Sequence, residues 1–387
     1  MRIQTPRPLT RPEPMPVQAV GHAPQPADRV VLGERRSDPV AANMQRLRET
    51  ARAARPAAPP SYAPPGRYLW DSWVLRDDSV TPPLYRLFHL DAPQTPDPEA
   101  RHDRARVRQA VSTDLRTWTD VGEALGPGEK GRWDDQAIWT GNVYRAADSG
   151  YRFFYTGRNQ RDGQLQRIGL AKSSDGVHFS RSEHALLEPD GRWYETTETS
   201  PVYKAWRDPT VVTDSATGEH VMLFTARTRE GDSRYKGCIG AARASHLDGP
   251  YTATAPVLAP GRYAQMEVPQ VIERDGKVYL FFSCWASDYA PAWAEATGGG
   301  QSGLHAWVGD SLTGPFSPVN GDGVVTRTDD NLYTVKLVDD PSRPGEYTAL
   351  GWYVNDRPGE KALTLSPPIP VTWEGDRITL APRDPAR

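Results

Sequence analysis

From Tyr68 onward, short runs of Val, Ile, Tyr, Phe and Trp alternate with clusters of Gly, Asp and Pro. Runs of β-branched and aromatic residues that are bounded by turn residues are typical of β-strands. We therefore predict an all-β domain over residues 66–387.

The strand segments repeat in a fixed order. Each repeat begins with a strand-like segment, which we call the leading segment, and continues with a second strand that follows a turn. In the first four copies a third strand follows, and after it come a polar turn and an aromatic residue. The leading segments begin near residues 69, 137, 206, 266 and 331, so the repeat is about 60–69 residues long. Five copies of a short antiparallel sheet predict a five-bladed β-propeller. A two-sheet sandwich is the alternative, but it would not require this order of segments.

The composition changes near residue 60. Residues 1–65 are rich in Pro, Ala and Arg and poor in aromatic residues, so they have little apolar surface to bury. We expect a disordered or extended N-terminal arm here, with one short exposed helix over residues 43–54. The opening stretch, residues 1–14, lacks the apolar segment of a secretory signal, which favours a cytoplasmic protein or export by a non-standard route.

The net charge of the chain and the length of its apolar runs limit the classes of partner that it could bind. The chain has 387 residues and a net charge of −3, which disfavours nucleic acid as a partner. No apolar run approaches the length of a membrane span. Cys238 and Cys284 lie in strand-like segments, where two buried free thiols are expected, although one disulfide stays open. The histidines and cysteines show no metal-ligand spacing, and the oligomeric state is not predicted.

The leading segments also carry the candidate chemistry. In a propeller the first strand of each blade lines the centre, so residues at one end of these strands converge. Asp71, Trp139, Asp208 and Glu267 are expected at equivalent positions of four blades. Each carboxylate taken alone could instead have a structural role. Asp208 could accept hydrogen bonds from the backbone of a turn, and Glu267 could form an ion pair with Arg262. Their recurrence in the repeat favours a shared site.

Three carboxylates beside tryptophans suit chemistry on a sugar. Transfer of a glycosyl group with retention needs a nucleophilic carboxylate and a carboxylic acid on opposite sides of the bond. Burial beside another carboxylate raises the pKa of the acid as that role requires. Tryptophan rings offer flat apolar walls, and a third carboxylate can bind sugar hydroxyls.

Three motifs resemble those of glycoside hydrolase family 68, the levansucrase and inulosucrase family, which shares its fold with the invertases. They are "WDSW" (70–73), "RDP" (207–209) and "MEVP" (266–269), and the resemblance covers roughly residues 68–360. It implies a five-bladed propeller that needs no metal or organic cofactor. The implied substrate is sucrose or another β-fructofuranoside, whose fructosyl group passes to water or to a sugar acceptor through a fructosyl-enzyme.

The same resemblance implies roles for individual residues. Asp71 would be the nucleophile, Asp208 the transition-state stabiliser and Glu267 the acid/base. The segments 101–106 and 311–325 also look like segments of that family. The implied substrate-binding residues are Trp70, Trp139, Thr140, Arg207, Gln265, Trp285 and Tyr333.

The chain departs from the family on the side of the leaving group. Val268 stands where the family has an Arg, Gln265 where many members have a second acidic residue, and Trp285 where an Arg or His is usual. These differences imply weaker orientation of an acceptor, and therefore hydrolysis and short oligosaccharides rather than long levan.

Two other functions stay open at the level of sequence. One is an exo-glycosidase of a related five-bladed family that acts on fructan oligosaccharides or arabinosides. The other is a catalytically silent carbohydrate-binding propeller, against which the presence of all three carboxylates argues.

Overall fold

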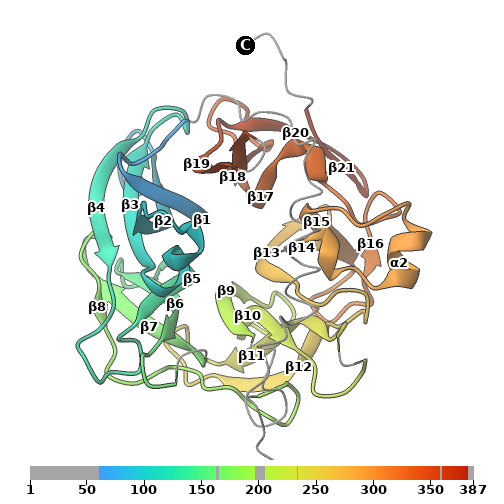
Figure 1. The fold of residues 1–387 in the computed structure, drawn as a ribbon, viewed down its shortest axis with the longest axis horizontal. Coiled ribbons are helices and arrows are strands. Elements are labelled where there is room, and N and C mark those ends of the chain that lie inside the picture. The colour runs from blue at the N-terminus through green and yellow to red at the C-terminus, as the bar shows by residue number, and fades with distance from the viewer. Residues whose placement is uncertain (1–60, 163–164, 197–204, 233, 358–359, 382–387) are drawn as a thin grey trace, which may run out of the picture. The chain divides into compact units, whose positions relative to one another are not determined.

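Five antiparallel sheets make up the described part of the chain. The computed structural model describes residues 61–162, 165–196, 205–232, 234–357 and 360–381. The five sheets are arranged as blades around a common centre (Figure 1), so the predicted five-bladed β-propeller is confirmed. Residues 1–60 lie outside the described residues, and the predicted arm and its helix over 43–54 therefore stay predictions.

Each blade is a meander in which strands that follow one another in the chain pair side by side. The first two blades comprise β1 (Arg67–Asp77), β2 (Leu84–Pro93), β3 (Arg106–Ser112) and β4 (Thr119–Leu125), then β5 (Ala137–Arg145), β6 (Tyr151–Arg158), β7 (Gln166–Ser173) and β8 (Ser180–Arg181). The third and fourth comprise β9 (Trp206–Thr213), β10 (His220–Arg227), β11 (Gly237–Ala244) and β12 (Thr252–Leu258), then β13 (Glu267–Arg274), β14 (Lys277–Cys284), β15 (Gly303–Gly309) and β16 (Ser317–Pro318). The fifth comprises β17 (Leu332–Asp339), β18 (Tyr347–Arg357), β20 (Ile369–Glu374) and β21 (Arg377–Leu380), with β19 (Glu360–Leu365) paired to β18.

The described helices are short and lie in loops between strands. They are the 3-10 turns η1 (Pro98–Asp103), η2 (Ala286–Asp288) and η3 (Thr328–Asp330) and the α-helix α2 (Pro291–Ala296). No helix in the described ranges has the length and apolar character that a membrane crossing requires.

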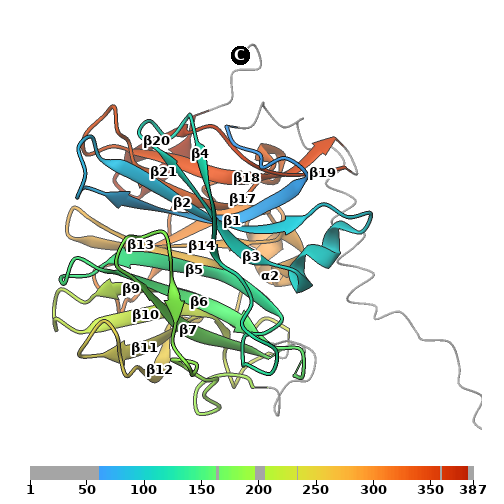
Figure 2. The same ribbon diagram turned by 90° about the vertical axis from the view of Figure 1, so that its left-hand side faces the viewer.

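The core lies between the blades. The middle strands are buried almost throughout, as in β10, where only His220 at the start is partly exposed. The sequences of such strands are nearly continuous apolar runs, because neighbouring blades cover both faces of the sheet. Figure 2 shows the stacked blades from the side. Aromatic rings fill the first of these interfaces, where Trp73 of β1 packs on Phe153 of β6 with ring centroids 5.7 Å apart. The predicted burial of Cys238 and Cys284 as free thiols is confirmed.

The inner strands of all five blades share one irregularity near their N-terminal ends. One extra residue interrupts the pairing with the second strand, between Trp70 and Ser72 in β1 and between Trp139 and Gly141 in β5. Equivalent interruptions follow Arg207, Glu267 and Tyr333 in β9, β13 and β17. A β-bulge of this kind bends the strand and changes the direction of its side chains. The repeated bulge therefore sets which side chains face the centre.

Candidate active site

Each bulge contributes a pair of consecutive residues to the centre of the ring. The residues immediately before the extra position are Trp70, Trp139, Arg207, Glu267 and Tyr333. The residues that follow them are Asp71, Thr140, Asp208, Val268 and Thr334, and all of these except Thr140 have a positive φ, between 37° and 60°. Positive φ is uncommon for residues other than Gly and marks a locally constrained backbone.

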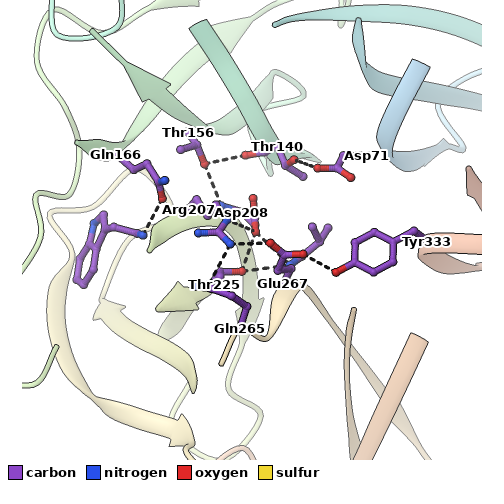
Figure 3. A network of polar contacts seen from close by, with 12 residues as sticks. Asp71, Thr140, Thr156, Gln166, Arg207, Asp208, Thr225, Gln265, Glu267 and Tyr333 are labelled. Carbon is purple, nitrogen blue, oxygen red and sulfur yellow. Dashed lines mark hydrogen bonds and ion pairs between the residues drawn. The ribbon is translucent and has the colours of Figure 1, made fainter. Parts of the chain in front are cut away.

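This pairing corrects one prediction from the sequence. Asp71 and Asp208 occupy the second position of their pairs, whereas Trp139 and Glu267 occupy the first. The four residues are therefore not equivalent in the repeat. The three carboxylates nevertheless lie at one site, where the charges of Asp208 and Glu267 act on Asp71. The extra residue lets both members of a pair contribute to that site, as Figure 3 shows for Arg207 and Asp208.

Asp71 is held by two donors from other blades. Its Oδ2 accepts a hydrogen bond from Thr140 Oγ1 at 2.9 Å, and its Oδ1 accepts one from Trp352 Nε1 at 3.2 Å. Burial, and after it the charges of Asp208 and Glu267, raise the pKa of the Asp71 carboxyl to about 6, although the two hydrogen bonds act in the opposite direction. Thr140 was predicted from the sequence. Trp352 was missed, since it lies on the second strand of the fifth blade and no motif marks it.

Asp208 accepts hydrogen bonds from other strands rather than from the backbone of a turn. Its Oδ2 accepts hydrogen bonds from Thr225 Oγ1 at 2.7 Å and from the backbone N–H of Val268 at 3.1 Å. Its own N–H donates to Thr156 Oγ1 at 2.9 Å. Burial is the largest cause of the raised pKa of Asp208, and the Arg207 guanidinium acts against it.

Glu267 lies between Arg207 and Tyr333 (Figure 3). Arg207 Nη2 donates to Oε1 of Glu267 at 2.7 Å, and the Tyr333 hydroxyl donates to Oε2 at 2.5 Å. The same Arg207 nitrogen donates to Gln265 Oε1 at 3.1 Å. Arg262, the structural partner considered from the sequence, instead places its guanidinium over the Trp293 ring, 3.9 Å from the ring centroid.

Aromatic rings continue the site from Glu267 in two directions. Trp285 stacks on Tyr333 with ring centroids 3.9 Å apart and an angle of 14° between the planes. On the other side Tyr333 meets the Trp352 ring edge-on at 5.8 Å. A row of three rings therefore runs from Trp285, on the predicted acceptor side, to the indole that binds Asp71.

The two predicted tryptophans near Asp71 lie on either side of His102. The rings of Trp70 and Trp139 each meet the His102 ring edge-on, at 6.0 and 5.9 Å, and Trp139 Nε1 donates to the His102 carbonyl at 2.7 Å. Trp70 is only 2% exposed, so it supports the site from behind, whereas Trp139 is half-buried. His102 belongs to the segment 101–106 that the sequence singled out, although it was not named as a site residue.

The arrangement gives three carboxylates distinct environments. Asp71 is buried and accepts hydrogen bonds from neutral donors, and Asp208 is buried with Arg207 Nε 3.5 Å from its Oδ2. The side chain of Glu267 is 21% exposed and pairs with Arg207 at 2.7 Å. Carboxylates in different environments can divide the roles of acid and nucleophile. No cluster of three or more His, Cys, Asp or Glu that could hold a metal ion occurs in the part of the chain that the structure describes.

Comparisons with known proteins agree with this arrangement. Residues 99–337 match the family model described as "Glycosyl hydrolases family 43". The extracellular sucrase of Zymomonas mobilis is 27% identical over 299 residues, which cover 67% of this chain and 70% of that protein. The levansucrase of Rahnella aquatilis is 28% identical over 260 residues, or 60% of each chain.

Solved structures show the same fold. The inulosucrase from Halalkalicoccus jeotgali bound to kestose superposes with a TM-score of 0.70 and 27% identity, covering 86% of this chain and 94% of that chain. The levansucrase from Gluconacetobacter diazotrophicus gives a TM-score of 0.67 at 19% identity, with 85% and 84% of the two chains covered. At that lower identity the likeness is one of fold.

Proposed function

We propose that this chain, which belongs to the glycosyl hydrolases of family 43, is a retaining β-fructofuranoside-acting enzyme of the levansucrase and inulosucrase type. Sucrose is the proposed donor, and the fructosyl group passes to water or to a sugar acceptor. The finer kinship with family 68 is supported by the "WDSW" and "RDP" motifs and by relatives named sucrase, levansucrase and inulosucrase. The observation that carries the proposal is the set of three carboxylates, Asp71, Asp208 and Glu267, which the inner strands of the first, third and fourth blades bring to one site (Figure 3).

The first step breaks the glycosidic bond. Asp71 attacks the anomeric carbon of the fructosyl unit, and Glu267 gives its proton to the leaving oxygen, so that an ester between the fructosyl group and Asp71 forms. The pKa of Asp71, about 6, leaves it ionised as a nucleophile at neutral pH. The Tyr333 hydroxyl suits both states of Glu267, because a hydroxyl donates to a carboxylate and accepts from a carboxylic acid.

The second step releases the fructosyl group. Water or a sugar hydroxyl attacks the anomeric carbon of the ester, Glu267 takes the proton of the attacking group, and Asp71 leaves as a carboxylate. Glu267 and Asp71 then have the protonation states with which they began. Asp208 and Arg207 hold the fructosyl ring, and Asp208 strengthens its hydrogen bonds to the sugar hydroxyls as positive charge develops in the transition state.

A second candidate is an exo-glycosidase that acts on fructan oligosaccharides or arabinosides. It is favoured by one observation: the family model that matches residues 99–337 is that of family 43 rather than that of the family whose motifs the carboxylates resemble. The two candidates use the same carboxylates and differ in the substrate: the second would release fructose from fructan oligosaccharides, or arabinose from arabinosides, rather than act on sucrose.

The test is incubation with sucrose and separate measurement of glucose and fructose. Equal amounts indicate hydrolysis, and an excess of glucose over free fructose indicates transfer. Release of neither sugar, together with release of arabinose from arabinosides, would replace the proposed function with the second candidate. Asp71→Asn protein serves as the control for contaminating activity.

Stereochemistry tests the mechanism separately. With methanol as acceptor, retention gives methyl β-fructofuranoside, which nuclear magnetic resonance distinguishes from the α-anomer. Retention also requires the carboxyl groups of Asp71 and Glu267 to lie about 5–5.5 Å apart in a structure with bound sugar. The α-anomer, or a separation of about 9 Å, would indicate inversion.

A further inference from the structure

A buried lysine lies next to the site and has no part in the mechanism above. Lys336 lies on β17, three residues after Tyr333, and is only 7% exposed. Its ammonium donates to the backbone carbonyls of Val268 at 2.8 Å and Pro269 at 3.1 Å. Both acceptors belong to the bulge that directly follows Glu267 in β13.

The hydrogen bonds of Lys336 help to hold the backbone of this bulge in place. Val268 has a φ of 53°, a conformation that a β-branched residue adopts only under constraint. Its N–H donates to Oδ2 of Asp208, and its carbonyl accepts from Lys336. One residue therefore ties Asp208, Lys336 and the backbone of Glu267 together, and the position of the Glu267 side chain depends on these bonds.

Among the described residues, no carboxylate forms an ion pair in direct contact with the Lys336 ammonium. Carbonyl oxygens satisfy the hydrogen bonds of an ammonium but carry no formal charge, so its burial is costly. Burial lowers the pKa of Lys336 to about 8, while the charges of Asp208 and Asp71 favour its protonated form. Coulombic interaction is mutual, so the ammonium in turn favours ionisation of these two carboxylates. Arg207, the other cation of the site, pairs with Glu267 at 2.7 Å and with Asp208 at 3.5 Å, and no ion pair joins it to Asp71 among the described residues.

We propose that Lys336 is a positioning residue of this site. Its ammonium holds the Val268–Pro269 backbone behind Glu267, and its charge favours the ionised form of Asp71. The charges that act on it are those of Asp208 from β9 and Asp71 from β1. Asp208 also has Arg207 beside it, so Asp71 is the carboxylate that depends most on Lys336, and its ionisation is required by the first chemical step. The kinetic consequences rest on the proposed function, whereas the ionisation of Asp71 does not.

The kinetic test compares Lys336→Met, which removes charge and donors at similar length, with Lys336→Arg, which keeps both. In Lys336→Met we expect kcat/KM on sucrose to fall roughly tenfold or more, mainly in kcat. The acid limb of its pH profile should move up by about one pH unit, because Asp71 loses a favourable charge. Lys336→Arg should keep the wild-type acid limb. Lys277→Met is the matched control, since Lys277 pairs with Asp376 at the far end of β14.

A second measurement needs no substrate. The carboxyl signal that disappears in Asp71→Asn can be titrated by infrared absorption in the wild type and in Lys336→Met, and it should titrate at higher pH in the variant. If Lys336→Met does not fold, Lys336→Gln takes its place, with the same expected shift. An unchanged titration of Asp71, with only a lower Tm, would overturn the proposal and leave Lys336 a purely structural residue. A wild type that is inactive on sucrose would refute the proposed function but not this measurement.

Discussion

The backbone N–H of Val268 donates a hydrogen bond to Oδ2 of Asp208 at 3.1 Å. This bond joins the residue after Glu267, in the fourth blade, to a carboxylate of the third blade. Two of the three site carboxylates are therefore linked across the blade interface by this bond, in addition to Arg207, which pairs with Glu267 at 2.7 Å and lies 3.5 Å from Oδ2 of Asp208. Loss of either carboxylate should affect the site without removing the core that holds the blades together.

We expect Asp71→Asn, Asp208→Asn and Glu267→Gln each to give a folded protein with very little activity. Loss of a nucleophile or of a proton donor commonly costs on the order of 10²–10⁴-fold or more. The measurement is kcat/KM on sucrose, with circular dichroism to establish that each variant folds.

Glu273→Gln is the matched control for these variants. Glu273 lies on the same strand as Glu267 but is exposed, so its substitution should leave kcat/KM unchanged. A site variant that keeps near wild-type turnover would remove that residue from the mechanism.

Ionisation of Asp71 should oppose stability while it supports activity. The folded pKa of Asp71 is about 6, above its ordinary value of 3.8, so the folded state binds this proton more tightly than the unfolded state. Stability is therefore lost as the pH rises from about 4 to 6, and the cost remains in full above pH 6. Asp71→Asn removes that cost, which amounts to at most about 3 kcal/mol.

The measurement is the Tm of the wild type and of Asp71→Asn at pH 4 and at pH 7.5. The variant should be more stable than the wild type at pH 7.5, and the difference should shrink or vanish at pH 4. Equal differences at the two pH values would show that Asp71 is not the group responsible.

Removal of residues 1–60 should leave the fold and the activity intact, because their composition supports no core. The cut must spare the next two residues. Ser61 donates from its N–H to the Leu365 carbonyl at 3.1 Å, and Leu365 donates back to the Tyr62 carbonyl at 3.0 Å. A chain that begins at Ser61 should match the full-length Tm and kcat/KM, whereas one that begins at Arg67 should melt at a lower temperature. An inactive or insoluble chain beginning at Ser61 would contradict this expectation.

Hydrolysis and short oligosaccharides should dominate over long fructan. Trp285 presents an aromatic ring stacked on Tyr333, and Gln265 is already bound to Arg207. A stacked ring binds a sugar but orients its hydroxyls less tightly than a bidentate Arg would. A loosely oriented acceptor sugar loses the advantage of proximity, so it competes less well with water for the fructosyl group. Size-exclusion chromatography of the products from concentrated sucrose measures this, and abundant fructan of high molecular mass would contradict it.

The repeat, the number of blades and most of the residues that line the site could be predicted from the amino-acid sequence alone. Five similar sheets require five similar strings of strand and turn residues, so the period of the chain is visible without a structure. The motifs around Asp71, Asp208 and Glu267 are also visible in the sequence, because each motif lies within a single inner strand.

The contacts that hold these residues in place could not be predicted from the sequence, because they form between distant parts of the chain. Trp352 and Asp71 are 281 positions apart, and Lys336 and Val268 are 68 apart, so no spacing in the sequence connects them. The register was also hidden, because a bulge adds one residue to each inner strand and shifts the alternation that places side chains. Strand identity follows from local residue preferences, whereas the partners of a buried charge are set by which blades become neighbours when the ring closes.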